Sequence, residues 1–272
     1  MSFEVSGARA LADIPCRYGT SRLLVRGPRR SLREPYIAFL GSSDTYGCFV
    51  AHPFVALTEA EIGMTCVNLG CANAGVDAVL NDPDVIGIAA SARFSVVQIS
   101  GAQNMSNALY RVHPRRNDRF LSASARLRSI YPEVDFTDFH FNKHMLTTLH
   151  ELSAERFRMV RQEIQRAWLA RMRVLLERLG AQTRLLWLRR APVDADSALG
   201  EDPFLITAAM VDELADLSGG VIEVGVTPAG QSDDLDGMFY GPLQAPIAEL
   251  SLGPCAHEAI AGQLAANLRT VL

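Results

Sequence analysis

The chain of 272 residues has no run of about 20 uninterrupted apolar residues, the length that a membrane-spanning helix requires. Its N-terminus also lacks the basic and then apolar pattern of a secretory signal. These two absences predict a cytoplasmic protein with no membrane partner.

Paired cysteines are also missing. The chain has five cysteines, an odd number, and no CxxC pair, which argues against a disulfide framework and against a cysteine zinc site. Cys48, Cys66 and Cys71 stand among apolar neighbours, so we expect buried thiols there.

A metal motif is missing as well. His140 and His144 lie four residues apart, with His150 nearby, but no carboxylate stands at the spacing of a known zinc motif. We therefore expect neither a metal nor another cofactor.

The net charge of −4 gives no global attraction to nucleic acid, so any anion must be bound locally. One segment is suited to this. Arginines crowd around His113 between positions 111 and 119, and arginine binds phosphate, sulfate or carboxylate in bidentate fashion. We expect Arg115, Arg116 and His113, with Tyr46, to contact substrate; a solvated or subunit-contacting loop is the alternative.

Apolar runs alternate with helical spacing along most of the chain. Residues 36–40, 64–69, 94–100, 183–188 and 221–227 are expected as strands, separated by helices over 53–63, from position 76 and over 203–217. Such alternation predicts a three-layer, flavodoxin-like α/β fold with a parallel sheet of about five strands. We expect one domain over 1–272 with an irregular lead-in of thirty-five residues.

From about 108 to 180 the pattern changes to a helical excursion. Its last part is a long amphipathic helix with Ser153 as N-cap and a stop at Gly180. The exposed length of this helix makes a homodimer possible. A final helix over 256–268 is expected to start near His257.

Four polar positions converge on the carboxyl end of this sheet, where open α/β sheets bind ligands. Ser43 follows the first strand, the loop from Gly70 to Gly75 the second and Asn104 the third, and His257 opens the last helix. A serine nucleophile needs an adjacent base, for which His257 is the candidate. The Ser43 amide, a glycine amide of the 70–75 loop and the Asn104 side chain are candidate donors to an oxyanion.

The order of these blocks resembles the SGNH (GDSL-like) hydrolase superfamily. Gly41-Ser-Ser-Asp-Thr-Tyr-Gly47 is similar to its GDSxxxG block, Asn68 to Gly75 to its glycine block, and Gly101-Ala-Gln-Asn104 to GxxN. The resemblance implies a serine ester hydrolase or acyl-transfer enzyme, with an ester of a small molecule or an acylated carbohydrate as substrate. The catalytic residues would be Ser43, His257, Asn104, Gly75 and Gly70.

A closer resemblance is to a family of uncharacterised bacterial proteins, a domain of unknown function. They share the RGP, GxxxTYG, NLGxxNAGVD and VHPRRNDRF segments, here at 26–28, 41–47, 68–77 and 112–120. That family brings no activity with it.

Two positions depart from the superfamily pattern. Pro254 stands where an acidic residue usually orients the histidine, and Ser42 replaces the aspartate of the first block. Asp233, Asp234 and Asp236 are candidates for the missing carboxylate.

The alternatives are structural: Ser43 as a helix cap, the glycines as backbone turns, Asn104 as a cap and His257 as an ordinary helix residue. As a whole, the chain is either an enzyme, a silent relative that binds an anionic glycan or nucleotide-sugar, or a dimeric assembly protein.

Overall fold

A computed structural model describes residues 15–190 and 199–272. Within them a five-stranded sheet has the order β2-β1-β3-β6-β7, and all four neighbouring pairs are parallel. Its strands are β1 (Tyr36–Leu40), β2 (Thr65–Asn68), β3 (Phe94–Gln98), β6 (Thr183–Arg190) and β7 (Val221–Val226). The predicted α/β class and the number of strands are confirmed.

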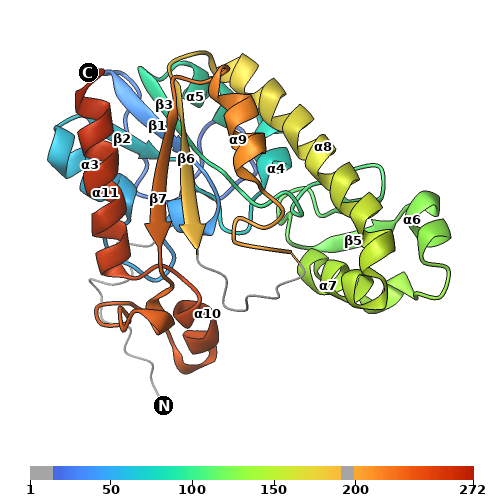
Figure 1. Cartoon of the computed structure of the whole chain (residues 1–272). Helices are drawn as coiled ribbons and strands as arrows, with labels where there is room; N and C mark the ends of the chain where they lie inside the picture. The colour runs from blue at the N-terminus through green and yellow to red at the C-terminus, as the bar shows by residue number, and fades with distance from the viewer. Residues whose placement is uncertain (1–14, 191–198) are drawn as a thin grey trace.

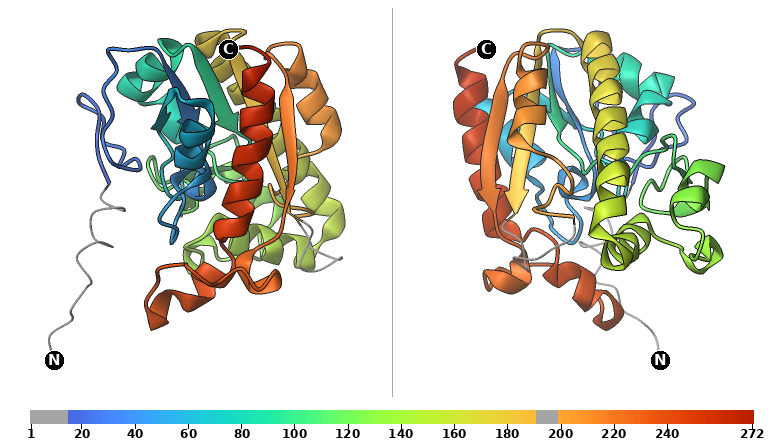
Figure 2. Two further views of the ribbon diagram at one scale, coloured as in Figure 1. Left: turned by 90° about the vertical axis from the view of Figure 1, so that its left-hand side faces the viewer. Right: turned by 45° about the vertical axis from the view of Figure 1, so that its right-hand side comes forward.

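Helices cover both faces of the sheet, which makes three layers (Figures 1 and 2). One face carries α3 (Phe54–Ile62) and α11 (Pro254–Arg269), and the other carries α4 (Val76–Leu80), α5 (Pro83–Ala90), α8 (Ala154–Leu179) and α9 (Ala208–Ala215). Successive residues of a strand point to opposite faces, so Ile37 and Phe39 pack toward α3 and α11, whereas Ala38 and Leu40 pack toward the other layer.

The chain between β3 and β6 builds a lobe beside the sheet and then returns along α8 (Figure 1). The lobe contains an antiparallel hairpin, which was not predicted from the sequence. Its elements are β4 (Tyr110–Val112), β5 (Phe120–Ala123), α6 (Ala125–Ile130), η1 (Phe136–Asp138) and α7 (Asn142–Leu152). The predicted limits of α8 are confirmed, since Ser153 caps its start and Gly180 ends it with a φ of 85°.

A compact segment after β7 lies across the carboxyl end of the sheet (Figure 1). It comprises η2 (Ala229–Gln231), η3 (Pro242–Gln244) and α10 (Ala245–Glu249). Phe239 donates its backbone N–H to the carbonyl of Phe49 at 2.7 Å. The segment therefore adjoins the chain that follows α2 (Ser43–Tyr46), the short helix after β1.

Several local predictions need correction. The helix expected over 203–217 is shorter and covers Ala208–Ala215. The Thr207 side chain accepts the Met210 N–H and so caps its start. The last helix begins at Pro254 rather than near His257. Cys66 and Cys71 are buried, whereas Cys48 is only partly so. Positions 1–14 of the expected lead-in lie outside the described residues.

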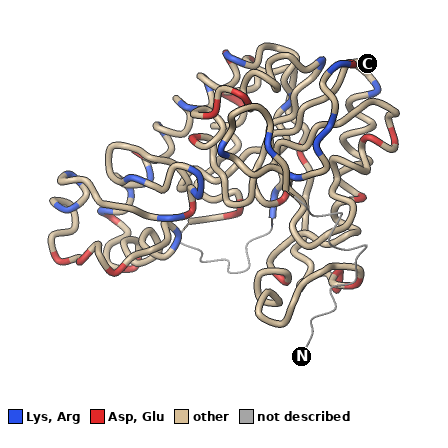
Figure 3. Tube along the Cα trace, turned by 180° about the vertical axis from the view of Figure 1, so that it is seen from behind, with Lys and Arg blue, Asp and Glu red and all other residues tan. Residues whose placement is uncertain are grey.

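Several arginines along α8 pair with acidic side chains. Arg166 pairs with Glu163, Arg171 with Asp77 and Arg173 with Glu213, and basic and acidic positions are interspersed along the trace (Figure 3). In the described part of the chain, no helix combines the length and apolar character needed to cross a membrane.

Candidate active site

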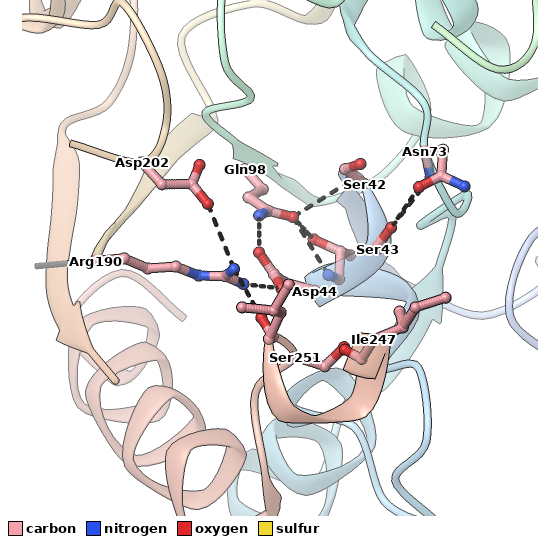
Figure 4. A network of polar contacts seen from close by, with 11 residues as sticks. Ser42, Ser43, Asp44, Asn73, Gln98, Arg190, Asp202, Ile247 and Ser251 are labelled. Carbon is pink, nitrogen blue, oxygen red and sulfur yellow. Dashed lines mark hydrogen bonds and ion pairs between the residues drawn. The ribbon is translucent and has the colours of Figure 1, made fainter. Parts of the chain in front are cut away.

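Ser43 begins α2 at the carboxyl end of β1, and its hydroxyl is bound to one residue (Figure 4). The Asn73 backbone N–H donates to Ser43 Oγ at 3.1 Å, and Oγ in turn faces Asn73 Oδ1 at 3.4 Å. The N-cap position belongs to Ser42, whose side chain makes no capping bond. Ser43 therefore does not cap α2, and its hydroxyl points toward the loop after β2.

Asn73 is the residue that the sequence reading missed. Its φ of 61° lies in the left-handed region, which asparagine tolerates better than other residues with a side chain. This conformation turns its N–H toward the serine hydroxyl. An asparagine inside a glycine-rich loop is the signal that would have indicated it.

The two glycines of that loop provide close approach between backbones. A Cβ on Gly70 would overlap the backbone of Thr45 and Tyr46, and one on Gly75 would overlap the Asn104 carbonyl. Their amides are already engaged, the first by Asn68 Oδ1 at 2.9 Å and the second by Asn117 Oδ1 at 2.8 Å. Neither amide is directed at a ligand in this arrangement.

Asn104 joins this group through its neighbours. Its Oδ1 accepts a hydrogen bond from the fully buried Asn142 at 3.3 Å, which leaves its amide N–H donors for another partner. Asn142 also donates to the backbone carbonyls of Gln103 and Asn117. Asn73 binds the Ser43 hydroxyl directly, whereas Asn104 is linked to the Asn73 loop only through Asn142 and Asn117. Ser43, Asn73 and Asn104 are called here the serine cradle.

His257 lies in a different setting. Its side chain is 1% exposed, and its ring stacks on Phe54 at a centroid distance of 5.6 Å. Its Nδ1 accepts the backbone N–H of Phe54 at 3.0 Å. Phe54 is the first residue of α3, and Pro53 at the N-cap supplies no side-chain cap. His257 therefore caps α3.

This contact fixes the tautomer of His257. A neutral imidazole that accepts at Nδ1 carries its proton on Nε2. Burial, opposed most strongly by the nearby Asp44 carboxylate, lowers the pKa of His257 from 6.5 to about 4. A general base for serine needs the opposite tautomer, with the lone pair on Nε2.

Asp234, one of the three loop aspartates, takes another role. Asp234 accepts the backbone N–H groups of Cys255 and Ala256, both at 3.2 Å, and so caps α11. Its carboxylate meets the start of the helix that carries His257 and makes no hydrogen bond to the ring within the described structure. Asp234 therefore supplies a carboxylate that caps the start of α11, but this carboxylate does not orient the imidazole.

A partly buried polar network lies beside Ser43 (Figure 4). Gln98, at the end of β3, contacts residues of the Ser43 turn. Arg190, at the end of β6, forms ion pairs with Asp44 and, at 3.3 Å, with Asp202. Partial burial raises the pKa of Asp202, which the Arg190 charge opposes. None of these four residues was predicted.

The predicted recognition residues are dispersed. His113 Nδ1 accepts the backbone N–H groups of Arg115 and Arg116 at 3.3 and 3.1 Å, so the imidazole closes its own turn. Arg115 lines a cavity of about 300 Å³ with residues 20–23 and 81–84, and Arg116 is exposed. The Tyr46 ring lies under the Arg26 guanidinium at 5.5 Å. The segment reaches the cradle through Asn117, whose N–H donates to the Asn73 carbonyl at 2.9 Å.

The three histidines considered as metal ligands are spread over the lobe. His144 forms a T-shaped ring pair with Phe139, and His150 forms one with Phe157. Within residues 15–190 and 199–272, no group of three or more His, Cys, Asp or Glu side chains is placed to hold a metal ion.

A family model described as "Domain of unknown function (DUF6473)" matches residues 1–272. The chain belongs to this family. No curated protein matches this DUF6473 chain.

Solved structures with a similar arrangement include a lipase from a goat rumen metagenome, at 14% identity and a TM-score of 0.43, covering 86% of this chain and 97% of that one. A carbohydrate esterase family 2 enzyme with a carbohydrate-binding domain, from Myceliophthora fergusii, has 10% identity and a TM-score of 0.45, covering 90% and 68%. A Lactobacillus plantarum protein has 16% identity and a TM-score of 0.42, covering 88% and 98%.

Proposed function

We propose that this DUF6473 protein is a serine ester hydrolase or acyl-transfer enzyme of SGNH type, with Ser43 as nucleophile. The observation that carries the proposal is the serine cradle, in which Asn73 meets a half-buried serine hydroxyl at the carboxyl end of a parallel sheet, and Asn142 and Asn117 link the Asn104 loop to the Asn73 loop.

The cradle offers donors to a tetrahedral intermediate. Ser43 Oγ would bond to the acyl carbon of an ester, and the carbonyl oxygen would take up negative charge. The Asn73 N–H, released from Ser43 Oγ as that atom bonds to the substrate, the Asn104 side chain and the Ser43 amide would stabilise this charge. Losing one such donor typically costs about 3 kcal/mol of barrier. The alcohol then leaves with the proton that the base removed from Ser43, and water or a second acceptor releases the acyl group.

Proton removal from Ser43 is the slow step in this proposal. The hydroxyl faces an amide oxygen of Asn73, which is no base, and Nδ1 of His257 is engaged by Phe54. His257 would act as base only after its ring releases that amide and carries a proton on Nδ1. The loss of an orienting carboxylate costs up to about 10⁴ in rate in serine triads, so we expect slow turnover.

The test is covalent trapping. Wild-type protein incubated with an alkyl fluorophosphonate should gain one adduct, which peptide mapping by mass spectrometry should assign to Ser43. Ser43→Ala should gain none and stay folded, because the lost hydroxyl bonds contribute only about 1 kcal/mol. Ser42→Ala is the matched control and should be labelled like wild type. Release of acid from short acyl esters, acetylated sugars among them, should follow the same pattern.

Because His257 Nδ1 is already bound to the Phe54 N–H, a second candidate is favoured. This is a catalytically silent protein that binds an anionic glycan or nucleotide-sugar. Such a protein would show no adduct after long exposure to the reagent. Its affinity for the ligand would depend on Arg115 or Arg116 rather than on Ser43. Titration calorimetry on Arg115→Ala and Ser43→Ala therefore distinguishes the silent protein from the enzyme.

A further inference from the structure

Gln98 occupies the centre of the turn that carries Ser43. Its Oε1 accepts three hydrogen bonds, from the Ser42 and Thr45 backbone N–H groups at 3.2 Å each and from Thr45 Oγ1 at 2.6 Å. Its Nε2 donates to Asp44 Oδ2 at 2.9 Å. Every residue from 42 to 45 except Ser43 is thereby fixed by one side chain that is 8% exposed.

Gly41 leaves the space that the Gln98 side chain occupies. A Cβ on Gly41 would overlap Thr45 Oγ1 and lie 2.6 Å from Gln98 Oε1. The glycine after β1 therefore lets the Gln98 amide lie over the end of that strand. Because α2 receives no cap from Ser42, the Gln98 oxygen replaces the cap at Thr45, the third residue of the helix.

The amide group is suited to its two neighbours. Its oxygen faces donors only, and its nitrogen faces a carboxylate that Arg190 holds from the other side. Arg190 is fixed in turn by Asp202 and by the Leu250 carbonyl at 3.2 Å. Neither a carboxylate nor an apolar side chain at position 98 would satisfy both neighbours.

We propose that Gln98 is a positioning residue of the reaction, which holds the Ser43 turn in its attacking orientation with Asp44 as its partner. This inference rests on the proposed function for its effect on reactivity. Displacing a reacting group by about 1 Å can cost about 10²-fold in rate, so the turn has a measurable influence on Ser43.

Gln98→Glu is the decisive single variant. At pH 8 the new carboxylate would face Asp44, and repulsion would displace the turn. Asp44, together with burial, raises the pKa of the new carboxyl group above its ordinary value, with Arg190 opposing. Once protonated at the lower pH, the group would donate that proton to Asp44. The other charged groups near this network are Asp202 with Lys143 beside it, and Arg26 and Asp234 near His257, which stays neutral at both pH values.

Two measurements report on the conformation of the Ser43 turn. The rate of fluorophosphonate labelling at Ser43, relative to wild type at the same pH, should fall about 10²-fold in Gln98→Glu at pH 8 and recover at pH 5. Exchange of the Ser42 and Thr45 amide hydrogens, followed by NMR and compared with wild type at the same pH, should be faster than in wild type at pH 8 and return to the wild-type rate at pH 5. Gln162→Glu, an exposed change of the same charge on α8, is the control and should alter neither.

The double variant Gln98→Glu with Asp44→Asn exchanges the amide and the carboxylate between the two positions. It keeps the number of donors and the net charge, so labelling and amide protection should return to within about threefold of wild type at pH 8. The inference is overturned if Gln98→Glu matches wild type in both readouts, or if the double variant is no better than the single one. If wild-type Ser43 is never labelled, the proposed function fails, and amide exchange alone decides whether Gln98 holds the turn.

Discussion

Helices beside the candidate site begin differently from those farther away. The caps of α5, α6, α8 and α9 come from the residue just before each helix: Asp82, Ser124, Ser153 and Thr207. By contrast, α2, α3, α4 and α11 take theirs from side chains remote in sequence: Gln98, His257, Asn117 and Asp234. The separation reaches 203 residues for His257 and Phe54.

This difference matters for the chemistry. A local cap fixes one helix end, whereas a remote cap also fixes the distance between two elements. Around Ser43, the polar side chains that first suggest catalysis are used in part to join helices to one another. His257 is the clearest case, because the atom that caps α3 is the one that would have to bear a proton during base catalysis.

Asn117→Ala should have the largest effect on stability. Asn117 is fully buried, and its Oδ1 accepts the Gly75 and Ala78 amides at 2.8 and 3.2 Å. Its removal leaves both amides unsatisfied, which should lower the free energy of unfolding by about 4 kcal/mol. Urea denaturation measures this, with the exposed Asn81→Ala as control. A loss of less than about 1 kcal/mol would mean that α4 does not depend on its remote cap.

The His257 cap should make the protein sensitive to acid. The unfolded histidine takes up a proton near pH 6.5 and the folded one only near 4, so the unfolded state binds the extra proton between these values. Stability should therefore fall as the pH falls through this window, by about 3 kcal/mol at its lower end.

His257→Phe should remove this part of the pH dependence, although it also loses the bond to Phe54. The measurement is the difference in unfolding free energy between variant and wild type from pH 7 to 4, with the exposed His52→Phe as control. A difference that does not change with pH would show that His257 does not stay neutral in the folded protein.

Ser153→Ala gives the smallest effect and sets the local reference. Ser153 accepts the Arg156 amide at 3.2 Å at a partly exposed site. Its replacement should cost about 1 kcal/mol and leave Ser43 labelling unchanged. If the cost equals that of Asn117→Ala by the same denaturation assay, remote and local caps do not differ as we infer.

The sequence predicted what depends on nearby residues. Apolar runs marked all five strands, and the limits of α8 followed from Ser153 and Gly180, because these signals act within a few residues. The placement of Ser43 and Asn104 at the ends of β1 and β3 follows from the same parallel topology.

What remained hidden depends on contacts between distant segments. Gln98 looked like an ordinary strand residue, and Asn73 stands between two alanines, where nothing local marks it except the tolerance of asparagine for a positive φ. The state of His257 was hidden for the same reason, since only the fold brings the first amide of α3 to its ring.

The lobe between β3 and β6 is tied into the sheet domain by Asn117 and Asn142, which bind the loops that carry Asn73 and Asn104. It cannot be treated as a removable insertion. A shortened relative that lost residues 110 to 142 would keep every strand of the sheet and both ends of α8. The loops around Ser43 would nevertheless lose the side chains that hold them in place. During synthesis, the same dependence means that the region around Ser43 cannot take its final form until the ribosome has passed the lobe.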